Sequence, residues 1–149
     1  MDVCSICVIS KFHEYILGSN WLDKSVGLCL KLGYMKILVT GAAGFTGRTL
    51  VQYLVSKGEA DIYGLVHRMQ PDLNKKMTCV EGDLLDQRQI QDIIAKICPD
   101  RIIHLAGIQK GNLQDLLSTN VIGTQNLLDA AHSVNPSCRI VIASSSAVY

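Results

Sequence analysis

The sequence predicts an α/β fold in which helices cover both faces of a parallel, doubly wound sheet. From Met35 onward, short apolar runs alternate with stretches whose apolar residues recur at helical spacing, which is the pattern of consecutive strand–helix–strand units. Charged residues make up 18% of the chain and apolar residues 48%, a balance that suits strands covered on both faces. At 149 residues, the chain has room for one domain of this kind.

The predicted elements follow one another without a long gap. Each predicted strand is a short apolar run, and the runs span residues 36–40, 61–67, 77–80, 101–105 and 139–143. The predicted helices span residues 45–57, 86–97 and 113–132. We therefore expect a Rossmann-like sheet that is truncated after its fifth strand.

Residues 1–34 differ from the rest because they show no clear period, and Met35 directly precedes the first predicted strand. We expect residues 1–34 to be an extension outside the core and assign residues 35–149 to the domain. Cys4 and Cys7 form a single C-x-x-C, but a zinc site needs a second pair of ligands at regular spacing, so we expect no metal.

The charge pattern and the cysteines exclude several classes of protein. The net charge is +1 without a basic stripe, so we expect neither a nucleic-acid partner nor a membrane surface. No run approaches the roughly 18 apolar residues of a membrane span. The six cysteines do not form the dense framework of a small secreted protein. These observations favour a cytoplasmic protein with reduced thiols.

A glycine-rich loop joins the first predicted strand to the first predicted helix. Gly41, Gly44 and Gly47 form a G-x-x-G-x-x-G pattern at this junction. Glycine permits a tight turn and lets backbone N–H groups approach a pyrophosphate, and the start of the helix supplies unpaired donors. The position between a strand and a helix makes the pattern far more specific than three glycines alone. The loop predicts a nucleotide-binding site.

Four further motifs follow in order. They are Gly82-Asp83-Leu84 after the third strand, His104-Leu105-Ala106-Gly107 after the fourth, Asn120-Val121-Ile122-Gly123-Thr124 in the last helix and Ser144-Ser145-Ser146-Ala147-Val148-Tyr149 at the end. They resemble G-D-[LI], H-L-A-A, N-V-x-G-T and S-S-[SA]-x-V-Y-G. Together with the glycine loop, they make residues 35–149 resemble extended short-chain dehydrogenases/reductases of the NAD(P)-dependent epimerase/dehydratase type, which modify nucleotide sugars.

The resemblance implies a set of cofactor-binding residues and one catalytic hydroxyl. The cofactor-binding set is Gly41, Gly44, Phe45, Thr46, Gly47, His67, Arg68, Asp83, Leu84, Leu105, Ala106, Gly107 and Asn120. Ser145 matches the catalytic hydroxyl, with Ser144 or Ser146 as the fallback. Asp83 is implied to contact adenine, although an Asp at this place can also cap a turn. Asn120 is implied to bridge strands, and we interpret His104 as a packed core histidine rather than a catalyst.

The second strand bears on the choice of cofactor. In NAD-binding domains, an acid about 20 residues past the glycine loop binds the ribose 2′-hydroxyl. Here that position holds His67 followed by Arg68, and the planar guanidinium of Arg68 can pair with a 2′-phosphate. Arg48 is a second candidate for this contact. We therefore expect NADP rather than NAD.

The residues around the catalytic hydroxyl limit which reactions of the family are expected. The family's Tyr and Lys belong to a Y-x-x-x-K helix after this motif, which the sequence does not reach, so we expect this chain alone to be inactive. Ser146 and Ala147 stand where family dehydratases often carry an acidic pair, which leaves a nucleotide-sugar epimerase or a 4-keto-sugar reductase. The alternative is a nucleotide-binding module without catalysis. A homodimer is an expectation for the complete protein only, because one of the family's dimer helices lies beyond Tyr149.

Overall fold

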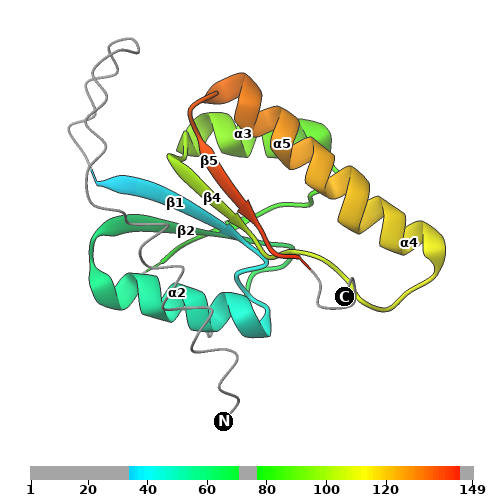
Figure 1. Cartoon of the computed structure of the whole chain (residues 1–149), viewed down its shortest axis with the longest axis horizontal. Helices are drawn as coiled ribbons and strands as arrows, with labels where there is room; N and C mark the ends of the chain where they lie inside the picture. Colours follow the sequence, from blue (N-terminus) through cyan, green and yellow to red (C-terminus); the bar gives the residue numbers. More distant parts are fainter. Residues whose placement is uncertain (1–33, 71–76, 145–149) are drawn as a thin grey trace. The chain divides into compact units, whose positions relative to one another are not determined.

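The computed structural model describes residues 34–70 and 77–144, in which a five-stranded parallel sheet forms the centre (Figure 1). The strands lie in the order β3-β2-β1-β4-β5, and every neighbouring pair is parallel. Their bounds are Met35–Thr40 for β1, Ala60–Val66 for β2, Thr78–Glu81 for β3, Arg101–His104 for β4 and Arg139–Ile142 for β5. The prediction of a doubly wound parallel sheet is confirmed.

Helices cover both faces of this sheet. Helix α2 (Phe45–Lys57) lies on one face, while α3 (Gln87–Ile97) and α5 (Gly123–Val134) lie side by side on the other (Figure 1). Helix α3 begins where the Asp86 carboxylate caps it by accepting a hydrogen bond from the Gln89 N–H at 2.9 Å. Helix α2 ends at Gly58, whose positive φ of 67° is favourable for glycine.

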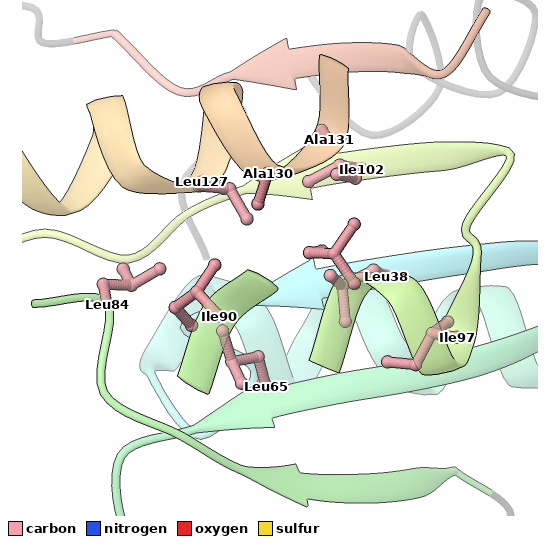
Figure 2. Close-up of a cluster of buried hydrophobic side chains, with 10 residues drawn as sticks. Leu38, Leu65, Leu84, Ile90, Ile97, Ile102, Leu127, Ala130 and Ala131 are labelled. Carbon is pink, nitrogen blue, oxygen red and sulfur yellow. The ribbon is translucent and has the colours of Figure 1, made fainter. Parts of the chain in front are cut away.

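The core under α3 and α5 contains leucine, isoleucine and alanine side chains that are almost completely excluded from solvent (Figure 2). It is built by Leu38, Leu65 and Ile102 from the sheet, Leu84 from the loop after β3, Ile90, Ile94 and Ile97 from α3, and Leu127, Ala130 and Ala131 from α5. Successive residues of a strand point to opposite faces, so Ile37, Val39 and Ile103 face α2. Both faces of the central strands are therefore buried, as their continuous apolar runs predict.

The helix expected over residues 113–132 has a different internal structure. It consists of α4 (Leu113–Leu117), a π-helical turn (Ser118–Ile122) and α5, which continue one another without a break. The Gly123 N–H donates to the Ser118 carbonyl five residues earlier, which defines the π-helical turn. Such a turn inserts one extra residue and changes the direction of the side chains within it, and here it contains Asn120.

The prediction for residues 1–34 falls almost entirely outside the described residues. Tyr34 is the one member of this stretch that the structure describes, and its side chain is exposed. The assignment of residues 1–34 to an extension thus stays a prediction.

Candidate dinucleotide-binding site

The strand order identifies one edge of the sheet as the place for a ligand. Strands β1 and β4 are neighbours at the centre, and Thr40 pairs with His104 at their carboxyl ends. After β1 the chain builds the β2 and β3 side of the sheet, and after β4 it builds the β5 side. In open α/β sheets, ligands bind beside the carboxyl ends of the strands at this point of reversal. The glycine loop and residues 105–107 are the segments that follow β1 and β4.

Each of the three glycines contributes a different feature to the geometry of this loop. Gly41 has a φ of 67°, and a Cβ atom there would lie 2.8 Å from the Ala106 backbone nitrogen, so the loops after β1 and β4 are in direct contact. The Gly44 N–H donates to the Gly41 carbonyl at 2.9 Å and closes the turn. A Cβ atom on Gly47 would lie 2.1 Å from the Gly41 carbonyl oxygen, so only glycine lets α2 begin this close to the turn.

The first turn of α2 offers unpaired donors to an anion. Gly44 is the N-cap of the helix and provides no side-chain cap. The N–H groups of a helix's first turn have no partner within the helix, and they carry the positive end of its dipole. Phe45 is 87% exposed and Thr46 is exposed, so these residues leave the turn open. An uncapped helix start after a tight glycine turn fits a pyrophosphate.

The segment after β2 contains Arg68 and is bound by Arg48 from α2. His67 and Arg68 are exposed, as an interaction with a ligand requires. The Arg48 guanidinium donates through Nε to the Ala43 carbonyl at 2.9 Å and through Nη2 to the Gln70 side chain. Arg48 thus ties the glycine loop to the segment that contains Arg68.

An acidic residue that lies beside the end of β2 was not identified from the sequence. Glu81 on β3 pairs with Val66, the last residue of β2, and its carboxylate accepts a hydrogen bond from the Met69 N–H at 3.2 Å. The expected position of the acid lies at the end of β2, whereas Glu81 is contributed by the neighbouring strand. Only the register between β2 and β3 could have revealed it.

Asp83 caps a turn after β3. Its Oδ1 atom accepts a hydrogen bond from the Leu85 N–H at 2.9 Å, and its own N–H donates to the Gln89 side chain at 2.7 Å. Leu84 is buried in the core beneath α5. The turn-capping role considered for Asp83 is therefore present in the structure, and an adenine contact would use the other carboxylate oxygen, Oδ2.

Asn120 fixes the loop after β4. Its Oδ1 atom accepts from the Ile108 N–H at 2.9 Å, and its Nδ2 group donates to the Ile108 carbonyl at 2.9 Å. Leu105 and Ala106 are half-buried, while Gly107 is exposed. Asn120 thus connects the π-helical turn to the loop after β4. The resemblance implies a different role for it, a bridge between strands.

His104 is a core residue, as predicted. The residue is 2% exposed, and its ring places Nδ1 at 2.6 Å from Thr40 Oγ1 and Nε2 at 2.9 Å from Thr124 Oγ1. Burial lowers the pKa of His104 below its ordinary value, which favours the neutral ring.

The predicted catalytic residue lies outside the described residues. Ser145 and Ser146 follow the described part of the chain, and Ser144 is its last, exposed residue. One Y-x-x-x-K spacing does occur within the sequence, at Tyr53 and Lys57. It lies in α2, where the Lys57 ammonium sits 5.2 Å from the centre of the Tyr53 ring. Tyr53 is about 13 Å along the helix from Gly44 at 1.5 Å per residue, so this pair does not belong to the glycine-loop site.

Neither a metal centre nor a membrane span is found in residues 34–70 and 77–144. In this part of the chain, no three His, Cys, Asp or Glu side chains lie close enough to hold a metal ion together. Over the same residues, every helix is too short or too polar to cross a bilayer.

The fold and the glycine loop define a Rossmann-type nucleotide-binding domain. Residues 37–149 match the family model of the NAD dependent epimerase/dehydratase family. This chain belongs to that family, which confirms the resemblance drawn from the motifs.

The similar proteins include both epimerases and dehydrogenases. A bifunctional UDP-glucose 4-epimerase and UDP-xylose 4-epimerase of Arabidopsis thaliana is 32% identical over 129 residues, covering 74% of this chain and 36% of its own. The CDP-paratose 2-epimerase of Salmonella typhi is 30% identical, over 77% of this chain and 38% of its own. The crystal structure of a uronate dehydrogenase mutant from Agrobacterium tumefaciens in complex with NAD is 33% identical, with a TM-score of 0.65 over 76% of this chain and 42% of that one.

Each of these similar proteins is considerably longer than this chain. The matched part spans 36% and 38% of the two epimerases and 42% of the uronate dehydrogenase. The shared region is the one that contains the glycine loop and the sheet.

Proposed function

We propose that this chain forms the cofactor-binding part of an NAD(P)-dependent enzyme that epimerises nucleotide sugars or reduces 4-keto sugars. The observation that carries the proposal is the uncapped start of α2 behind a glycine turn at the point where the sheet reverses its winding. Membership of an NAD-dependent family whose similar proteins include nucleotide-sugar epimerases supports the substrate class.

The residues divide into three groups of contacts. Backbone N–H groups from Phe45 to Gly47 would hold the pyrophosphate. Asp83 Oδ2, which has no hydrogen bond within the described residues, would accept from the adenine amino group. Residues 105–107 and Asn120 would form the wall beside the other half of the cofactor. The nicotinamide, when bound, supplies the hydride chemistry.

NADP remains the proposed cofactor because of the two arginines beside the end of β2. Arg68 is exposed there, and Arg48 is fixed to Gln70, two residues beyond it. Arg68→Ala is expected to weaken NADP⁺ binding by about 1–3 kcal/mol, the value of a charge-assisted hydrogen bond, and to leave NAD⁺ binding unchanged. Titration calorimetry with both cofactors measures this. Lys96→Ala, which removes one positive charge from the last turn of α3, is the control. Equal affinities of the unaltered protein for NAD⁺ and NADP⁺ would contradict the assignment.

Ser145 is the proposed catalytic hydroxyl, and we propose that residues 35–149 alone carry out no turnover. General acid–base catalysis contributes about 10²–10⁴-fold, and Tyr53–Lys57 is too distant from the glycine loop to provide it. The test is to purify residues 35–149 and to assay NADPH oxidation with 4-keto nucleotide sugars and epimerisation of UDP-sugars. Cofactor binding without turnover is the expected result. Turnover on the order of 1 s⁻¹ or more would refute the proposal.

For the complete protein, we propose a homodimer formed through the exposed side of α4 and the π-helical turn. Leu113, Leu117 and Val121 follow one another at four-residue spacing and are 72%, 47% and 54% exposed. Apolar side chains in such a row favour burial against a second surface. Leu117→Glu should convert a dimer to a monomer in sedimentation velocity, and Gln125→Glu on the exposed side of α5 should not.

A further inference from the structure

A continuous chain of hydrogen bonds joins the carboxyl ends of β1 and β4 to the helix that follows β4. It begins at the Ala106 N–H, which donates to Thr40 Oγ1 at 3.2 Å, and passes from Thr40 to His104 Nδ1 at 2.6 Å. It continues from His104 Nε2 to Thr124 Oγ1 at 2.9 Å, and from Thr124 to the Asn120 carbonyl at 2.8 Å. Strand β1, strand β4 and the helix beyond β4 are joined by these four bonds.

The partners fix the position of every proton in this chain. A carbonyl only accepts, so the single hydroxyl proton of Thr124 goes to Asn120, and Thr124 Oγ1 must accept from His104 Nε2–H. In a neutral imidazole the other nitrogen is then an acceptor, so Nδ1 accepts from the Thr40 hydroxyl. Thr40 is completely buried, and with a cationic His104 its hydroxyl proton would have no described acceptor. The geometry therefore selects the neutral tautomer with its proton on Nε2.

Both ends of the chain lie at the loop after β4. Thr40 holds this loop at Ala106, directly beside Gly41, while Asn120 holds it at Ile108 through both side-chain bonds. A Cβ atom on Gly107 would lie 3.1 Å from Asn120 Oδ1, so the side chain also packs against the loop between its two attachments. The loop is thus restrained on each side of Gly107.

We propose that His104 is a positioning residue which, as the Nε2–H tautomer, couples the glycine loop to the loop after β4 through Thr124 and Asn120. The proposal rests on the proposed function, because the two coupled loops are the two walls of the dinucleotide site. Holding both loops in the binding geometry before the cofactor arrives reduces the ordering cost of binding. The described hydrogen bonds of the Thr124 hydroxyl go to His104 and to the Asn120 carbonyl and not to either loop, so its effect passes through these two residues.

The tautomer is the first test, and it does not depend on any ligand. Long-range ¹H–¹⁵N correlation spectra of the chain distinguish a proton on Nε2 from one on Nδ1. The expected result is Nε2–H for His104 in the unaltered protein and a mixture of tautomers in Thr124→Val, which removes the acceptor. A proton on Nδ1 in the unaltered protein would overturn the assignment.

The coupling is tested by amide exchange and cofactor affinity in the same variants. Thr124→Val should speed hydrogen exchange of the Ile108 N–H at least several-fold and weaken binding of NAD⁺ or NADP⁺, whichever binds more tightly, by about 3- to 10-fold, or about 0.7–1.4 kcal/mol. Thr124→Ser, which keeps the hydroxyl, should restore both. Thr119→Val is the matched control, because Thr119 lies in the same π-helical turn and its side chain makes no hydrogen bond within the described residues.

The two proposals fail in different ways. If the unaltered protein binds neither NAD⁺ nor NADP⁺, the proposed function fails, and the tautomer and the Ile108 exchange rate still decide whether the two loops are coupled. If the protein binds cofactor and Thr124→Val only lowers its melting temperature, with unchanged affinity and unchanged exchange at Ile108, the coupling is refuted.

Discussion

Replacing Gly47 with alanine is the sharpest test of how the glycine loop is built. The added Cβ atom would lie 2.1 Å from the Gly41 carbonyl oxygen and 2.8 Å from the Ala42 Cα atom. Both neighbours are backbone atoms of the turn, so no side chain can rotate away and α2 itself must move. Overpacking typically costs about 1–3 kcal/mol, and because the whole helix must shift we expect about 3 kcal/mol or more here. The same shift moves the first-turn N–H groups away from the pyrophosphate position.

The assay is urea unfolding followed by far-UV circular dichroism, together with calorimetric titration of NAD⁺ and NADP⁺ into each variant. Gly58→Ala is the control at the other end of α2, where a Cβ atom would meet nothing within 4 Å and the positive φ alone is strained. That control should lose about 1 kcal/mol of unfolding free energy and keep its cofactor affinity. Gly47→Ala with unaltered stability and affinity would refute the packing argument.

Three further predictions concern the pH response, a helix end and the first residues. Burial lowers the pKa of His104, so the unfolded chain binds a proton that the folded chain does not. The unfolding free energy should therefore fall as the pH drops below about 6.5, with a slope of up to about 1.4 kcal/mol per pH unit. His104→Gln should remove this contribution to the slope. An equal slope in the variant and in the unaltered protein would contradict the prediction. Cys98 caps α3 with a φ of 49°, so Cys98→Gly should raise the unfolding free energy by about 0.5–1 kcal/mol where Cys98→Ala does not. A chain that starts at Met35 should keep the melting temperature of the full chain. If its unfolding free energy were lower by several kcal/mol, residues 1–34 would belong to the fold.

The sheet and the glycine loop could be predicted because local patterns determine them. A central strand such as β1 is buried on both faces, so its sequence is a continuous apolar run wherever it occurs. The glycines of the loop are read with equal ease, since a positive φ at Gly41 and the close approach at Gly47 admit no other residue. Backbone constraints of this kind restrict the residue type at the constrained position, so they can be recognised in the sequence.

The π-helical turn could not be predicted for the opposite reason. The turn places Asn120 where its side chain makes two hydrogen bonds to Ile108, twelve residues away and in another element. The apolar spacing over residues 113–132 is that of an ordinary helix, and one inserted residue changes it little. These contacts are tertiary, so the local apolar spacing does not reveal them, although the motif that begins at Asn120 does single out the residue.

The choice between NAD and NADP also depends on tertiary contacts that the sequence does not reveal. A substitution of Glu81 tests this choice. Its carboxylate accepts from the Met69 N–H beside Arg68, so a 2′-phosphate would meet one negative charge together with the two arginines. Unit charges about 4 Å apart interact by about 1 kcal/mol in water, so Glu81→Gln should strengthen NADP⁺ binding by about 2- to 5-fold relative to NAD⁺. Glu59→Gln, an exposed acid just before β2 begins, is the control for a change in net charge. Should Glu81→Gln instead weaken NAD⁺ and leave NADP⁺ unchanged, Glu81 would be the acid that binds the ribose, and the assignment of NADP would be wrong.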